Sequence, residues 1–145
     1  MSDAYLITAQ TLLDLCADEG DAHAAAAQAW ADGVAADKMR ISVVSVAQAR
    51  AAVDGIGDIS QRRGLTRRLD KLLASVTADG GPPSPFDRQA ATVWQELIAD
   101  PKLRGIAQTD RQVIATALER NLAIVEAPRL QHGYLKSIGL SVAAL

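Results

Sequence analysis

The side chains best suited to chemistry stand directly after apolar segments or at the start of an expected helix. Thr8 follows the apolar run 5–7, Gln48 comes shortly after the run 40–44, and Asp110 opens a helical pattern. Glu126 follows the apolar run 122–125. Carboxylates at such positions can hold Mg²⁺ or Mn²⁺, whereas hydroxyls and amides offer hydrogen bonds without charge. These residues can act as one site only if the elements of the fold bring them together.

Short apolar runs alternate with helical patterns along the chain. The runs 5–7, 40–44, 122–125 and 140–142 predict buried strands. Helices are expected over 11–17, 23–36, 46–53, 65–76, 85–98 and 109–120, with Asp21, Ser45, Ser84 and Thr109 as candidate N-terminal caps. This alternation predicts a mainly parallel sheet covered by helices on both faces. Ligands of such sheets bind beyond the carboxyl ends of the strands, where Thr8, Gln48 and Glu126 would lie.

Composition limits the possible classes of protein. The chain has 145 residues, 49% of them apolar and 22% charged, which indicates one folded domain over 1–145. Its 28 alanines favour helix, and its net charge of -2 makes strong nonspecific affinity for nucleic acid unexpected. A single cysteine, Cys16, excludes an intrachain disulfide and a cysteine-rich zinc site. With neither a signal-peptide pattern nor a membrane-spanning apolar run, we expect a cytoplasmic protein and no membrane partner.

Six segments, taken in their order along the chain, match the sequence pattern of a known protein family. They are Ile41–Ala47, Arg68–Leu73, Phe86 to Trp94, Asp110 to Arg120 and Leu122–Val125, followed by Ile138–Val142. In this order the chain resembles the PIN-domain proteins, and specifically the VapC-type toxins of toxin–antitoxin and plasmid-stability systems. The resemblance implies a three-layer α/β/α fold with a short-stranded, mainly parallel central sheet. It also implies a metal-dependent endoribonuclease whose three or four acidic residues hold Mg²⁺ or Mn²⁺.

The chain departs from that family at the acidic positions. Thr8 stands where the resemblance places the first acid, Gln48 where it places the second, and Gln131 where it places the fourth. Asp110 retains the third. Since hard divalent cations need carboxylate oxygens, this site should hold metal poorly, and no cofactor is expected. The primary hypothesis is a degenerate PIN domain, a pseudo-nuclease that binds a partner instead of cutting RNA. The resemblance implies a homodimer and a small antitoxin-like protein as partners.

Three alternatives stay open. Asp110 and Glu126 supply two carboxylates, which with water and substrate phosphates would hold one Mg²⁺ or Mn²⁺ in an active endoribonuclease, so whether the protein is an enzyme is undecided. RNA is a partner only in that case. An unrelated small α/β domain with flavodoxin-like winding would show the same alternation. The basic cluster 62–71 would contact RNA or an acidic partner, or simply form a solvated helix face.

Overall fold

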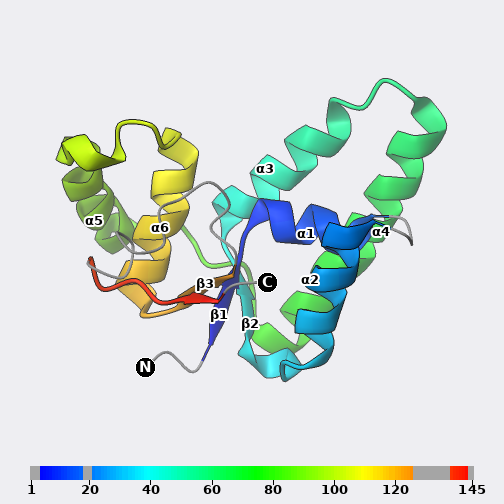
Figure 1. Ribbon diagram of the computed structural model, residues 1–145, viewed down its shortest axis with the longest axis horizontal. Coiled ribbons are helices and arrows are strands. Elements are labelled where there is room, and N and C mark those ends of the chain that lie inside the picture. Colours follow the sequence, from blue (N-terminus) through cyan, green and yellow to red (C-terminus); the bar gives the residue numbers. More distant parts are fainter. Residues whose placement is uncertain (1–3, 18–20, 126–137, 144–145) are drawn as a thin grey trace.

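Four short parallel strands form the centre of the molecule. The computed structural model describes residues 4–17, 21–125 and 138–143. The strands are β1 (Tyr5–Ile7), β2 (Met39–Ile41), β3 (Ala123–Val125) and β4 (Val142–Ala143), in the order β2-β1-β3-β4. All three pairings are parallel, with Ile7 opposite Ile41 on one side and Val125 on the other. The carboxyl ends of β1, β2 and β3 therefore meet at one edge of the sheet (Figure 1).

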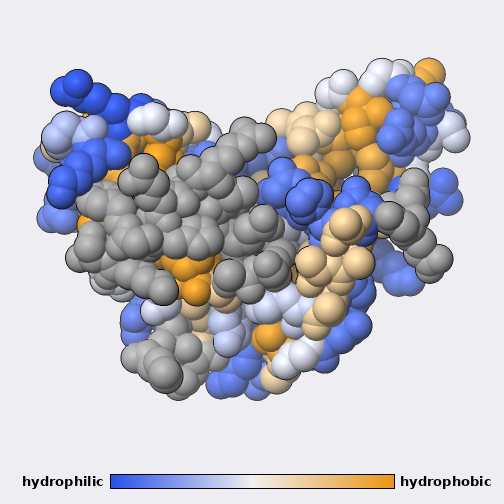
Figure 2. Space-filling model, viewed as in Figure 1, coloured by the Kyte–Doolittle hydropathy of each residue, from blue (hydrophilic) through white to orange (hydrophobic). Residues whose placement is uncertain are grey.

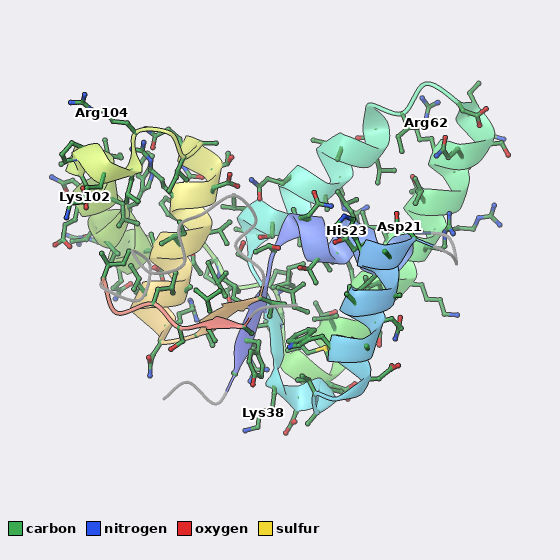
Figure 3. The ribbon with its side chains drawn as sticks, in the orientation of Figure 1. Asp21, His23, Lys38, Arg62, Lys102 and Arg104 are labelled. Carbon is green, nitrogen blue, oxygen red and sulfur yellow. The ribbon has the colours of Figure 1, made fainter. Side chains whose placement is uncertain are left out.

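Helices provide the connections and cover the sheet. They are α1 (Ala9–Cys16), α2 (Ala22–Asp32), α3 (Val43–Asp54), α4 (Ile59–Gly80), α5 (Arg88–Ala99) and α6 (Gln108–Arg120), with short 3₁₀ turns η1 (Ala36–Lys38) and η2 (Pro101–Leu103). The side chain of Asp21 caps α2 by accepting hydrogen bonds from the His23 and Ala24 N–H groups, as the sequence predicted (Figure 3). Within the described ranges, no helix is long and apolar enough to cross a membrane.

The two faces of the sheet carry separate apolar cores. Neighbouring residues of a strand point to opposite faces, so Leu6 packs with α5 and α6 whereas Ile7 packs with α1, α3 and α4. Figure 1 shows α5 and α6 on one side of the strands and α1 to α4 on the other. Leu6 and Ile7 are both fully buried. This is the three-layer α/β/α arrangement with a short parallel sheet that the sequence predicted.

The start of α3 differs from the prediction. The run 40–44 was expected to be a strand and Ser45 the cap of the next helix, but β2 ends at Ile41 and Ser42 is the N-cap. The Ser42 Oγ accepts a hydrogen bond from the Ser45 N–H at 2.9 Å, and its hydroxyl donates to the Ser45 Oγ at 3.0 Å. Serine is a favoured N-cap residue, so residue type alone does not distinguish Ser42 from Ser45. The strand ends early because Val43 donates its N–H to the Ser84 carbonyl instead of extending the main sheet.

The prediction for Ser84 was also wrong. Asp87, not Ser84, caps α5, by accepting from the Ala90 N–H at 2.9 Å. Ser84 forms an isolated parallel bridge with Ser42, in which its N–H donates to the Ile41 carbonyl at 2.7 Å. The expected capping box at Thr109 is absent as well, since α6 begins at Gln108 and its N-cap, Ala107, has no side chain that can accept. Ser84 is held by backbone hydrogen bonds to Ile41 and Val43, at the end of β2. The residues near Ser84 in the sequence give no sign of this long-range pairing.

Candidate functional site

Thr8 lies at the carboxyl end of β1 and caps α1. Its hydroxyl lies 3.3 Å from the Val125 carbonyl oxygen, to which it donates, and accepts from the Thr11 N–H at 3.4 Å. The hydroxyl thus joins the end of β1 to the end of β3, two neighbouring strands. Thr8 is uncharged, so at this edge it provides hydrogen bonds but no carboxylate for a metal ion.

Gln48 and Asp110 meet across the edge of the sheet. Gln48 lies on α3 and Asp110 in the first turn of α6, and the Gln48 Nε2 donates to the Asp110 Oδ1 at 3.0 Å. The two residues are 62 positions apart in the sequence. The N-terminal end of α6 favours a negative charge at Asp110 because its backbone N–H groups point toward that end. Two of the residues singled out from the sequence therefore lie in contact.

The described part of this site contains one carboxylate, where the metal chemistry of the resemblance needs several. Asp110 is exposed and Gln48 half-buried, and the amide of Gln48 adds a donor to one oxygen of Asp110. Over residues 4–17, 21–125 and 138–143, no three His, Cys, Asp or Glu side chains are placed to hold a metal ion together. A neutral amide gives Mg²⁺ no charge compensation. The donor set seen here does not fit a divalent metal ion.

Other residues at this edge serve the structure. The Gln10 Nε2 donates to the Asp14 Oδ1 at 3.0 Å along the exposed side of α1, so this amide is engaged within its own helix. Ser45 is buried against Ser42. Glu126 and Gln131 lie outside the described residues, so the structure places neither of them.

Arg111 is a structural residue that sequence reasoning missed. It is 5% exposed, its Nε donates to the Ile106 carbonyl at 3.0 Å, and its Nη2 donates to the Leu103 carbonyl. These bonds tie η2 to the start of α6 and so help to position Asp110. The only signal in the sequence is a charged residue inside the apolar pattern of α6, because arginine is rarely buried unless its donors are paired.

A pocket of mixed polar and apolar lining lies among α1, α3 and α4. It has a volume of about 450 Å³, and its lining combines apolar residues such as Leu13, Val53 and Leu65 with the polar side chains of Asp21, Gln61 and Arg68. Figure 2 shows exposed apolar surface in the region of α3 and α4. Nearby, Cys16 is buried, and burial raises the pKa of its thiol above the ordinary value, while the charge of Arg68 acts in the opposite direction. Cys16 is thus a core residue, as the sequence predicted.

Comparison with solved structures identifies the fold. No protein-family model matches the sequence, and no curated protein matches it either. The FitAcB structure from Neisseria gonorrhoeae matches with a TM-score of 0.76 and 21% identity, over 95% of both chains. VapBC2 from Rickettsia felis, solved with a promoter DNA fragment, matches with a TM-score of 0.71 and 14% identity, over 98% of both chains.

A third structure extends the same group. VapBC-5 from Mycobacterium tuberculosis, described as a member of the VapBC family of toxin–antitoxin systems, has a TM-score of 0.63 and 18% identity, over 99% of this chain and 98% of that one. The likeness covers nearly the whole chain in all three cases. It confirms the fold that the sequence resemblance implied. The chain therefore has the PIN-type α/β/α fold of VapC- and FitB-like toxin–antitoxin proteins.

Proposed function

We propose that the chain is a degenerate PIN-fold protein of toxin–antitoxin or plasmid-stability type, which binds a partner and does not cleave RNA. The hydrogen bond from Gln48 to Asp110 is the observation that carries the proposal. An amide stands where the resemblance places a second carboxylate, and it makes a direct contact with the one acid retained. Thr8 likewise stands where the resemblance places an acid, and its hydroxyl donates a hydrogen bond to the Val125 carbonyl oxygen.

The loss of negative charge at the site is the physical reason to expect no cleavage. A divalent cation activates water and stabilises negative charge on phosphate only if carboxylates hold it in place. Substituting a carboxylate by an amide preserves shape and hydrogen bonding but removes one unit of negative charge. The site that results suits the binding of a neutral or hydrogen-bonding group better than the binding of a metal ion.

The direct test combines metal binding with RNA cleavage on the pure protein. We expect titration calorimetry with Mg²⁺ and Mn²⁺ to show no binding at millimolar concentration, and single-stranded RNA to stay intact in either metal. Asp110→Ala should change neither result. The proposal would be wrong if the protein cleaved RNA in a metal-dependent way and Asp110→Ala abolished that cleavage.

An active endoribonuclease is the second candidate. Glu126 follows Val125 directly in the sequence, and Val125 ends β3 beside Thr8. A carboxylate from Glu126 together with Asp110 would give two acidic ligands, enough for Mg²⁺ or Mn²⁺ with water and substrate phosphate. Under this alternative, Glu126→Gln and Asp110→Asn would each abolish cleavage. If the protein is degenerate, RNA stays intact with the unmodified protein and with both variants.

Partner proteins complete the proposal. VapBC-5, which shares this fold, is a member of the VapBC family of toxin–antitoxin systems, and one FitAB structure of the same fold is bound to a DNA fragment. We propose an antitoxin-like protein as partner, a homodimer as the assembly, and the cytoplasm as the location. Light scattering of the pure chain tests the dimer, and co-expression with the product of an adjacent small gene tests the antitoxin-like partner.

A further inference from the structure

Arg111 is a buried cation that the proposed function does not use. Its side chain donates hydrogen bonds to the backbone carbonyls of Leu103 and Ile106, and neither of these partners carries a charge. Placing a guanidinium in the interior costs free energy even when its donors are paired, and an apolar side chain of similar size would fill the same space without that cost. The cation is therefore expected to do something that packing alone cannot do.

The helix that carries Arg111 begins without a side-chain cap. Helices α1 to α5 each have an N-cap residue whose side chain accepts a hydrogen bond from the first turn, namely Thr8, Asp21, Ser42, Asp58 and Asp87. At α6 the N-cap is Ala107, whose methyl group cannot accept, and residues 108–110 are all exposed. Because uncapped helix ends fray, the position of this first turn must be fixed by something else.

The guanidinium of Arg111 joins the first turn of α6 to a segment anchored in the core. Leu103 is 1% exposed, and Ile106 packs against the apolar core between the sheet and helices α5 and α6. The Arg111 backbone N–H also donates to the Ala107 carbonyl at 3.0 Å. Arg111 does not supply the acceptor that a capping side chain would. It fixes the path by which the chain enters the helix, which is the other effect of a cap.

Two side-chain contacts with other helices start from this same turn. The Asp110 Oδ1 accepts from the Gln48 Nε2 of α3 at 3.0 Å, and the Gln108 Oε1 accepts from the Trp94 Nε1 of α5 at 3.2 Å. Figure 1 shows α3 and α6 on opposite sides of the strands, so the contact between Gln48 and Asp110 spans the edge of the sheet. A displacement of the turn by roughly 1 Å would break both hydrogen bonds, because such bonds weaken steeply with distance.

We propose that Arg111 is the positioning residue of the site, because it replaces the missing cap of α6 and so holds Asp110 within reach of Gln48. Arginine suits this role because its planar fork of donors reaches two carbonyls at once, which the single ammonium of lysine does with poorer geometry. The proposal rests on the proposed function only in taking Asp110 as part of the site. It applies equally to a site that binds a partner and to one that holds a metal ion.

Nuclear magnetic resonance of the whole chain tests the geometry directly. The side-chain amide signal of Gln48 is assigned by its loss in Gln48→Ala, and Asp110→Ala gives its position when the contact with Asp110 is absent. We expect Arg111→Met to move the Gln48 signal to that position. The indole N–H signal of Trp94 should move as well, whereas that of Trp30, which packs on Tyr5, should stay in place.

A matched variant at the other end of α6 separates positioning from general loss of stability. Arg120 pairs with Asp87 at 3.4 Å, so Arg120→Met makes the same substitution in the same helix but far from Asp110. We expect the amides of residues 112–114 to exchange hydrogen at least about tenfold faster in Arg111→Met than in Arg120→Met. Arg111→Lys, which keeps the charge, should give intermediate shifts and exchange rates. Circular dichroism establishes which variants are folded.

Three results would overturn the proposal. The first is a folded Arg111→Met protein in which the Gln48 signal does not move, and the second is an equal movement of that signal in Arg120→Met. If Arg111→Met does not fold, Arg111→Lys decides, and unchanged Gln48 and Trp94 signals in that variant are the third. None of these measurements involves metal, RNA or a partner. Failure of this proposal is therefore separate from failure of the proposed function.

Discussion

Gln48 donates a hydrogen bond to Asp110, which is the acid of the family pattern that this chain retains. Its amide contacts Asp110 at 3.0 Å, so a carboxylate in its place would bring two negative charges together at the sheet edge. Two carboxylates so close repel each other in the absence of a cation and attract a divalent one. The identity of residue 48 is therefore expected to decide whether the site accepts metal.

Restoring a carboxylate at position 48 tests this directly. We predict that Gln48→Glu raises Mn²⁺ affinity by at least about tenfold, because it adds a charged oxygen ligand beside Asp110. Titration calorimetry measures the change. The chain offers a matched control in Gln28→Glu, since the Gln28 Nε2 donates to Asp32 at 2.8 Å on the exposed side of α2. An equal gain in both variants would show that the site at Asp110 has no special capacity for metal.

Cys16 links burial to pH. Burial raises the pKa of its thiol, with Arg68 acting in the opposite direction, so the folded protein holds the proton to higher pH than the unfolded chain does. A raised folded pKa stabilises the fold below the ordinary thiol pKa, and this contribution is lost as pH rises through the folded value. Cys16→Ala removes the titrating group.

We predict that the stability advantage of the unmodified protein over Cys16→Ala is about 1 kcal/mol at neutral pH and shrinks above pH about 9. Urea denaturation of both proteins across that range measures it. The thiol should also react slowly with a thiol reagent until the protein is unfolded. A constant difference across the pH range would mean that the thiol does not change its pKa on folding.

At the scale of elements, the close approach of α4 to β2 depends on Gly80. A Cβ at Gly80 would lie 2.0 Å from the Met39 carbonyl oxygen, so any larger residue must push the end of α4 away from β2. Gly64, in the same helix, has only the end of the Arg68 side chain near its Cβ position, at 3.9 Å. A side chain is therefore excluded at Gly80 but has room at Gly64.

We predict that Gly80→Ala destabilises the protein by about 2 kcal/mol or more, because backbone must move to relieve the overlap. Gly64→Ala should stabilise it by up to about 1 kcal/mol, since alanine is the better helix former and the space is open. Thermal denaturation of both variants gives the comparison. Equal effects of the two substitutions would contradict the tight contact between α4 and β2.

At the scale of the whole molecule, the sequence predicts the layers better than the boundaries. The strand 5–7 was predicted correctly, because an apolar run this short, followed by polar residues, is typical of a buried strand. Helix starts were missed at Ser42 and Asp87, where serines at 45 and 84 offered equally good caps. The choice depended on backbone pairing between Ser84 and β2, which is a contact between segments far apart in sequence.

The candidate site was predictable only in part. Thr8, Gln48 and Asp110 were identified by their order along the chain and by the resemblance to PIN-domain proteins. Spacing alone cannot give the contact between Gln48 and Asp110, because the two residues are 62 positions apart and the fold brings them together. Arg111 was missed since its partners are backbone carbonyls, which leave no mark in a sequence.

The bridge at Ser84 also determines where the sheet can grow. Ser84 occupies the backbone groups of Ile41 and Val43 at the β2 edge, so an incoming extended peptide would find those hydrogen bonds already made. Unpaired edges invite strand addition and aggregation. With this edge blocked, recognition of another chain there would depend on side chains and not on the backbone groups that every protein shares.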